Sequence, residues 1–144
     1  MATRFQATFD CTDPDRIARF WAAALDYQLQ DPPTGYASWE AFLAAQGIPE
    51  EEWSRASAIV DPSGQGPRLY FQRVPEPKVV KNRVHLDLDV GGGPGSPQQE
   101  RATRVDAAVE RLIGQGATRL RVQDDHGAYT VVMQDPEDNE FCLH

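Results

Sequence analysis

The chain has 144 residues, and its 14 Lys and Arg against 22 Asp and Glu give a formal net charge of -8. This acidity argues against a nucleic-acid partner, because binding a phosphate backbone requires clustered cations. No stretch approaches the ~20 apolar residues that span a bilayer, and the first residues show no export signal, so we expect a cytoplasmic protein without a membrane partner.

The sequence repeats one pattern, from Phe5 to Gln72 and again from Val84 to His144. Each copy begins with an alternating strand, continues with an apolar-striped helix and ends with a strand that an Asp-Pro pair precedes. Two copies of one β-α-β unit predict a pseudo-symmetric fold with a site between them. Because the chain is too short for two independent cores, we expect one domain, with modules of about residues 3–74 and 83–144.

The first module contains a strand over residues 5–10 and then a helix. Asp13 reads as the N-cap and Pro14 as the first helical residue, and the apolar stripe that follows predicts a helix from about Pro14 to Leu25. An insertion over residues 36–57 follows, with Trp39 in a short helix that ends near Gly47. We interpret the insertion as a cap on one end of the sheet, with a lid over the site as the alternative.

The linker and the second module come next. Two prolines exclude residues 74–78 from a central strand, so this segment should join the modules. After a strand over residues 84–89, Ser96 reads as an N-cap with Gln99 three residues later, and the helix should end at Gly114 and Gly116. Strands over residues 118–122 and 129–134 should form a hairpin, with its loop at residues 124–127.

Polar side chains share one face of the opening and closing strands. Alternation places Gln6 and His85 at equivalent positions of the two opening strands, and sends Tyr70, Gln72 and Cys142 to the same face of the closing strands. Convergent polar groups in a concave site are candidate ligand contacts, so we predict that these five residues bind the ligand. Which residues are catalytic stays open.

The two cysteines, Cys11 and Cys142, are not spaced as a metal knuckle or a redox pair. In a chain without a secretion signal they are expected to be free thiols.

The motifs at both ends of the chain resemble one superfamily. Residues 20–25 and the segment from Asp135 to Phe141 are similar to those of the vicinal oxygen chelate superfamily, which includes glyoxalase I, bleomycin-resistance proteins and extradiol dioxygenases. Residues 35–40, 67–78 and 81–87 resemble those of the actinobacterial glyoxalase-like domain proteins. The resemblance implies an α+β fold of two β-α-β-β-β modules, which form a cupped mixed sheet with helices on its outer face, and it implies a homodimer.

The same resemblance implies a metal site of four ligands from the opening and closing strands. The matching positions are Gln6, then Tyr70 or Gln72 depending on register, then His85 and Cys142. We take His85, Gln6 and Gln72 as the metal ligands, with Ni, Zn, Mn or Fe as the ion. The carboxylate expected near Cys142 is absent, which argues against glyoxalase I activity itself.

A second ligand set can be drawn from strand parity alone, namely His85, Asp87, Cys142 and His144. Two functions follow. The first is a divalent-metal-dependent lyase or isomerase that acts on the vicinal oxygens of a small molecule. The alternative is a metal-free binding module that sequesters an aromatic or antibiotic-like ligand on Tyr70, Trp39 and Trp53.

Overall fold

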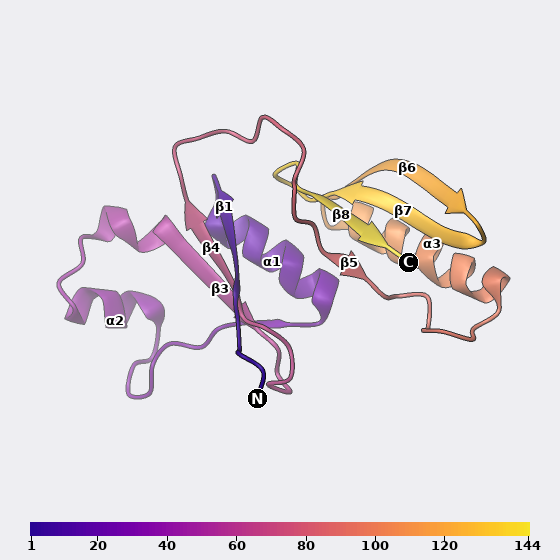
Figure 1. Ribbon diagram of the computed structural model, residues 1–144. Coiled ribbons are helices and arrows are strands. Elements are labelled where there is room, and N and C mark those ends of the chain that lie inside the picture. The colour runs from indigo at the N-terminus through magenta and orange to yellow at the C-terminus, as the bar shows by residue number, and fades with distance from the viewer. The chain divides into compact units, whose positions relative to one another are not determined.

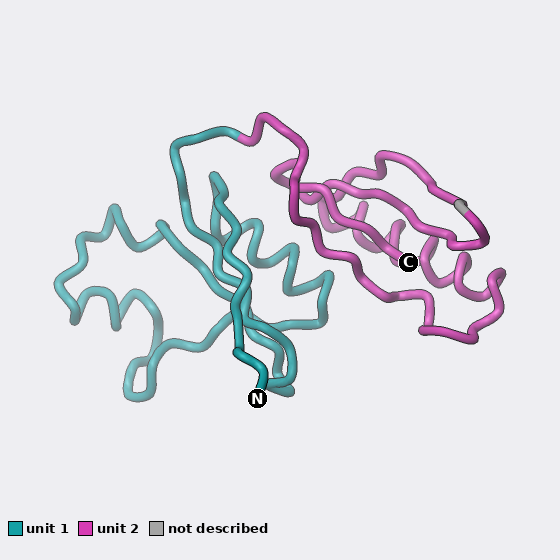
Figure 2. The backbone as a smooth tube through the Cα atoms, in the orientation of Figure 1, with its two compact units in different colours: residues 1–77 teal, residues 78–144 magenta. Residues whose placement is uncertain are grey.

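Figure 1 shows the computed structural model of the chain, which describes residues 1–144 apart from the side chain of Asp125. The chain forms two compact units, residues 1–77 and 78–144 (Figure 2). Each unit contains a four-stranded mixed sheet, which confirms the predicted α+β class. Among the residues described, no helix has the length and apolar character needed to cross a membrane.

The first unit has the order β-α-β-β-β, with the insertion between its second and third strands. Its elements are β1 (Ala7–Cys11), α1 (Pro14–Leu25), β2 (Gln28–Leu29), α2 (Trp39–Ala45), η1 (Glu50–Arg55), β3 (Ala56–Val60) and β4 (Leu69–Arg73). The sheet order is β1-β4-β3-β2. Strands β1 and β4 are parallel, whereas β3 is antiparallel to both β2 and β4.

Helix α1 forms where the sequence predicts it. The side chain of Asp13 accepts a hydrogen bond from the backbone N–H of Arg16 at 3.2 Å, and Pro14 is the first helical residue. The apolar stripe of the helix packs on the sheet, where Trp21 and Phe71 are fully buried. Phe9 contacts both rings, with centroid distances of 5.4 Å to Trp21 and 5.2 Å to Phe71.

One indole group joins the insertion to the rest of its unit, and a second forms a bond within the insertion. Trp39 Nε1 donates to the backbone carbonyl of Gln30 at 2.7 Å, and Trp53 Nε1 donates to that of Ile48 at 2.9 Å. Both Trp N–H groups therefore have backbone partners within the unit. The cap and lid interpretations both stay predictions.

The second unit repeats the first without the insertion. Its elements are β5 (Asp87–Leu88), α3 (Gln98–Gly114), β6 (Thr118–Asp125), β7 (Ala128–Gln134) and β8 (Glu140–Leu143). Its sheet order is β5-β8-β7-β6. This matches β1-β4-β3-β2 of the first sheet strand for strand, and β5 is parallel to β8 as β1 is to β4. The predicted duplication is confirmed.

Three local predictions for the second unit were wrong. The hairpin loop is shorter than the predicted residues 124–127, because β6 extends to Asp125 and β7 begins at Ala128. Strand β5 is shorter than predicted, because its ladder to β8 pairs only Asp87 and Leu88 with the facing strand. Ser96 does not cap α3. Its hydroxyl donates instead to the carbonyl of Gly92 at 2.8 Å, and the helix begins at Gln98 without a side-chain cap.

Both Asp-Pro pairs begin the turn before a closing strand, as predicted. The carboxylate of Asp61 accepts from the backbone N–H groups of Ser63 and Gly66 at 2.8 and 2.7 Å. That of Asp135 accepts from the N–H groups of Glu137 and Asn139 at 2.9 and 3.0 Å. The bond from Gly66, followed by those from Ser63, lowers the pKa of Asp61, because N–H donors stabilise the ionised carboxylate.

Candidate functional site

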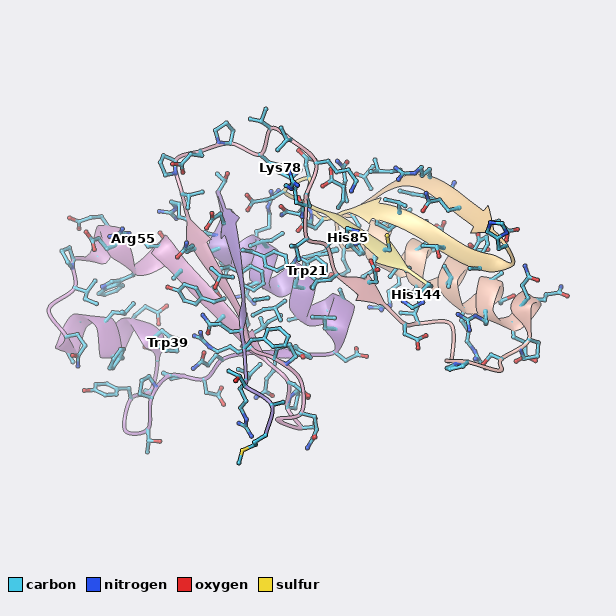
Figure 3. The ribbon with its side chains drawn as sticks, viewed as in Figure 1. Trp21, Trp39, Arg55, Lys78, His85 and His144 are labelled. Atoms are coloured by element: carbon cyan, nitrogen blue, oxygen red, sulfur yellow. The ribbon has the colours of Figure 1, made fainter. Side chains whose placement is uncertain are left out.

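Three side chains that can bind a metal converge on one sheet face of the second unit. One ligand atom from each of His85, Asp87 and Cys142 lies within 4.8 Å of the others. Asp87 and Cys142 face each other across the parallel β5–β8 ladder, and His85 precedes Asp87 by two residues on the same face. The strand period of two therefore brings all three together. Figure 3 labels His85 beside these strands.

A short hydrogen bond joins two members of this cluster. His85 Nδ1 lies 2.7 Å from Asp87 Oδ1. A carboxylate accepts hydrogen bonds from an imidazole N–H, so Nδ1 is the donor in this pair. A cation that binds both atoms would replace the proton between them.

The third member, Cys142, is half-buried. Burial raises the pKa of its thiol, and the negative charge of Asp87 adds to the rise because it disfavours a thiolate nearby. A thiol binds metal as the thiolate. Cys142 would therefore release its proton on binding a cation.

His144 does not join this cluster, although it shares the parity of Cys142. Its backbone N–H donates to the carbonyl of Leu88 at 3.0 Å, and its own carbonyl accepts from the N–H of Val90 at 2.9 Å. Of the four residues that strand alternation placed on one face, three form the cluster among the residues described, and His144 is left out.

A carboxylate that the sequence did not single out lies two residues before Cys142. Glu140 Oε2 is 3.2 Å from Lys78 Nζ and accepts from the backbone N–H of Asn82 at 2.9 Å. Burial works to raise the pKa of Glu140, but the Asn82 and Lys78 contacts outweigh it and the pKa is lowered. This carboxylate is held by the segment that opens the second unit, so it is not a free base.

In the first unit the predicted residues also share a face, and their amides are already bonded. Gln6 Oε1 accepts from Nη1 of Arg68 at 2.9 Å, and the Arg68 guanidinium lies over the ring of Tyr70, 5.1 Å from its centroid. Gln72 Nε2 donates to Asp10 Oδ1 at 2.8 Å. Sequence parity found these residues, but it gave no sign of the amide contacts.

The comparisons with known proteins agree with this duplicated fold. A family model described as "Glyoxalase-like domain" matches residues 6–144, nearly the whole chain. The chain belongs to the glyoxalase-like domain family. No curated protein matches its sequence.

Solved structures share the fold of this glyoxalase-like domain at low sequence identity. A glyoxalase/bleomycin resistance protein/dioxygenase family enzyme from Burkholderia phytofirmans is 15% identical with a TM-score of 0.61, and the match covers 96% of this chain and 94% of that one. The fosfomycin resistance protein FosX from Mesorhizobium loti is 14% identical with a TM-score of 0.62, over 100% and 92% of the two chains. A FosX mutant from Listeria monocytogenes, complexed with Mn(II) and 1S,2S-dihydroxypropylphosphonic acid, is 11% identical with a TM-score of 0.64, over 100% and 92%.

The strand register of this glyoxalase-like domain bears on the choice between Tyr70 and Gln72. Tyr70 faces Ala58, three residues before the Asp of the first turn, and Cys142 faces Val132, three residues before the Asp of the second. Tyr70 is therefore the counterpart of Cys142, and Gln72 lies two residues further along the strand. The metal-binding role of Gln6 and Gln72 stays a prediction.

Proposed function

We propose that this glyoxalase-like domain binds a divalent cation through His85, Asp87 and Cys142, and acts with it as a lyase or isomerase on a small molecule that carries vicinal oxygens. The observation that carries the proposal is the convergence of an imidazole, a carboxylate and a thiol within 4.8 Å. The Mn(II) complex of Listeria FosX, which shares the fold, supports a metal in a protein of this architecture.

The donor set fits a borderline-soft cation. An imidazole nitrogen and a thiolate sulfur favour Zn²⁺ or Co²⁺, whereas Mn²⁺ and Mg²⁺ prefer oxygen donors. Three protein donors leave coordination positions for substrate, as in catalytic zinc sites. We therefore expect zinc to be held more tightly than manganese in this chain.

The chain's own residues have separate tasks in this proposal. A bound cation would supply a Lewis acid that polarises a substrate oxygen. His85 Nδ1 and Asp87 Oδ1 lie 2.7 Å apart, so a cation held by both would take the place of the proton between them. Glu140 is engaged by Lys78 and Asn82, so Asp87 is the carboxylate that would hold the cation.

A metal-free binding module is the second candidate, and the state of Cys142 favours it. The raised pKa keeps the thiol neutral in the absence of a cation, so the face can receive an uncharged ligand group. Tyr70 offers a ring on the exposed face of the first sheet. Trp39 keeps part of its ring exposed, and the N–H groups of Trp39 and Trp53 are bonded to backbone carbonyls.

The two candidates are separated by metal retention. Purified protein is loaded with zinc, cobalt, manganese or nickel, desalted, and its metal content measured by plasma mass spectrometry. We expect near-stoichiometric zinc in the wild type and a loss in His85→Ala. The matched control is His126→Asn, at a hairpin-turn histidine with φ of 55°, a conformation that Asn tolerates.

Retention that survives His85→Ala, or none of any ion in the wild type, would contradict the metal proposal. The second result would support the binding module.

A further inference from the structure

The side chain of Arg68 is held in one orientation on the exposed face of the first sheet. Its Nε donates to Gln30 Oε1 at 2.7 Å, its Nη1 donates to Gln6 Oε1 at 2.9 Å, and its guanidinium lies over the ring of Tyr70. Three contacts from three different strand segments thus fix a side chain that loses up to about 2 kcal/mol of rotamer entropy when it is ordered.

None of these contacts neutralises the charge. Both bonded partners are neutral amides, and no carboxylate of the described residues forms an ion pair with Arg68, whereas Arg19 and Arg55 pair with Asp15 and Glu52. The chain has a net charge of -8, so carboxylates are abundant. An ordered but unneutralised guanidinium in such a chain is suited to an anion from outside it.

The support beneath Arg68 is itself anchored. The backbone N–H of Gln30 donates to the carbonyl of Ala58 at 2.9 Å, and its own carbonyl accepts from Trp39 Nε1 at 2.7 Å. The insertion and β3 therefore both position the residue that orients Arg68. Such preorganisation reduces the entropy that a ligand must offset on binding.

We propose that Arg68 is an anion-binding residue, which takes the carboxylate or phosphonate group of a small-molecule ligand. One N–H of Nη1 and both of Nη2 remain to donate after the two glutamines are satisfied, and these can hold two oxygens of one anionic group. The ring of Tyr70 forms the floor beside them. The inference names the ligand class for the small-molecule function proposed above, and it does not depend on the metal.

The test follows the Arg68 Nε–Hε signal by NMR in metal-free protein, assigned by its loss in Arg68→Lys. The probes are benzoate and phenylphosphonate, which separate the two kinds of anion, and neutral benzamide, which has the shape without the charge. We expect a saturable shift with one or both anions and no shift with benzamide. Equal shifts with benzamide, or none with either anion, would overturn the proposal.

Variants then locate the contact, with affinities measured by calorimetry. Arg68→Gln removes the charge, and Gln30→Glu keeps Arg68 but supplies an internal carboxylate beside Nε. Each should weaken anion binding at least about ten-fold. Arg83→Gln is the control, because Arg83 is exposed and has no hydrogen bond or ion pair among the described residues.

Unchanged affinity in both Arg68→Gln and Gln30→Glu, with thermal unfolding showing that they are folded, would overturn the proposal. Zinc retention is measured on the same variants and should be unchanged, because the substitutions leave the proposed ligands His85, Asp87 and Cys142 in place. Loss of anion binding with zinc retained therefore tests the Arg68 proposal, whereas loss of zinc tests the proposed metal site.

Discussion

At the scale of single residues, the contact between Asp87 and Cys142 links charge to thiol reactivity. Asp87 raises the pKa of the thiol because its negative charge disfavours a second one nearby. We expect Asp87→Asn to lower the Cys142 pKa, so that the pH profile of its alkylation moves to lower pH and the rate at neutral pH rises. Alkylation of the Cys142 peptide, followed by mass spectrometry, measures this.

The control for that experiment is Asp89→Asn, two residues further along the chain. Asp89 accepts a hydrogen bond from the N–H of Gly93 and is not among the groups that shift the Cys142 pKa. A profile that stays in place in Asp87→Asn, or that moves equally in the control, would contradict the assignment.

How much of the site could be predicted differs from residue to residue. The alternation of strand residues suffices to place His85, Asp87 and Cys142 on one face, because the period of two is a local property. The exclusion of His144 could not be predicted, because parity gives a face and not a distance. The engagement of Glu140 by Lys78 spans 62 positions, which no local pattern encodes.

At the scale of elements, the two long helices begin in different ways. The side chain of Asp13 caps α1, whereas α3 has no side-chain cap. Asp13→Ala should lower the free energy of unfolding by about 1 kcal/mol, as removing an N-cap does. Ser96→Ala, the matched change before α3, should have a much smaller effect.

Chemical denaturation of both variants measures these free energies. Equal losses would mean that Ser96 acts as a cap after all. The sequence alone could not show that Asp13 caps its helix and Ser96 does not. Both residues have the side chain of an N-cap, but Ser96 lies after a Gly-rich loop and bonds to Gly92 instead.

The first Asp-Pro turn predicts a pH dependence of stability. The pKa of Asp61 is lower in the folded chain than in the unfolded chain, so its contribution is fully present above about pH 4 and is lost as the pH falls through the folded value. Asp61→Asn should therefore lower the melting temperature at neutral pH, and the difference from wild type should narrow at acid pH.

Thermal unfolding of wild type, Asp61→Asn and the exposed-loop control Asp31→Asn across this range gives the comparison. A difference between wild type and Asp61→Asn that is constant with pH would contradict the role of the ionised carboxylate.

At the scale of the whole molecule, the duplication is what the sequence predicts most completely. Helix α1 and both closing strands appear close to where periodicity and turn residues place them, since these signals are local. The hairpin forms as predicted, but with a shorter loop, because β6 continues to Asp125. Strand β2, with its two residues, is too short to have a periodic signal of its own. The homodimer stays a prediction, which light scattering of the purified protein measures.

The two halves have the same topology but different chemistry. The first unit presents an ordered cation at Arg68, and the second presents a metal-ligand cluster at His85, Asp87 and Cys142. Divergence of duplicated positions thus gives each unit its own proposed task, anion binding in one and cation binding in the other.

The central claim is that Cys142 ligates the cation, and cobalt titration tests it most directly. Co(II) is added to wild type, Cys142→Ser and Cys11→Ser while the sulfur-to-cobalt charge-transfer absorption is recorded. Cys11 is the matched control, because it is buried and its thiol donates to the backbone carbonyl of Gln72. We predict saturation near one equivalent with this band in wild type and Cys11→Ser, and its absence in Cys142→Ser. Saturation without the band, or a band that persists in Cys142→Ser, would contradict the account.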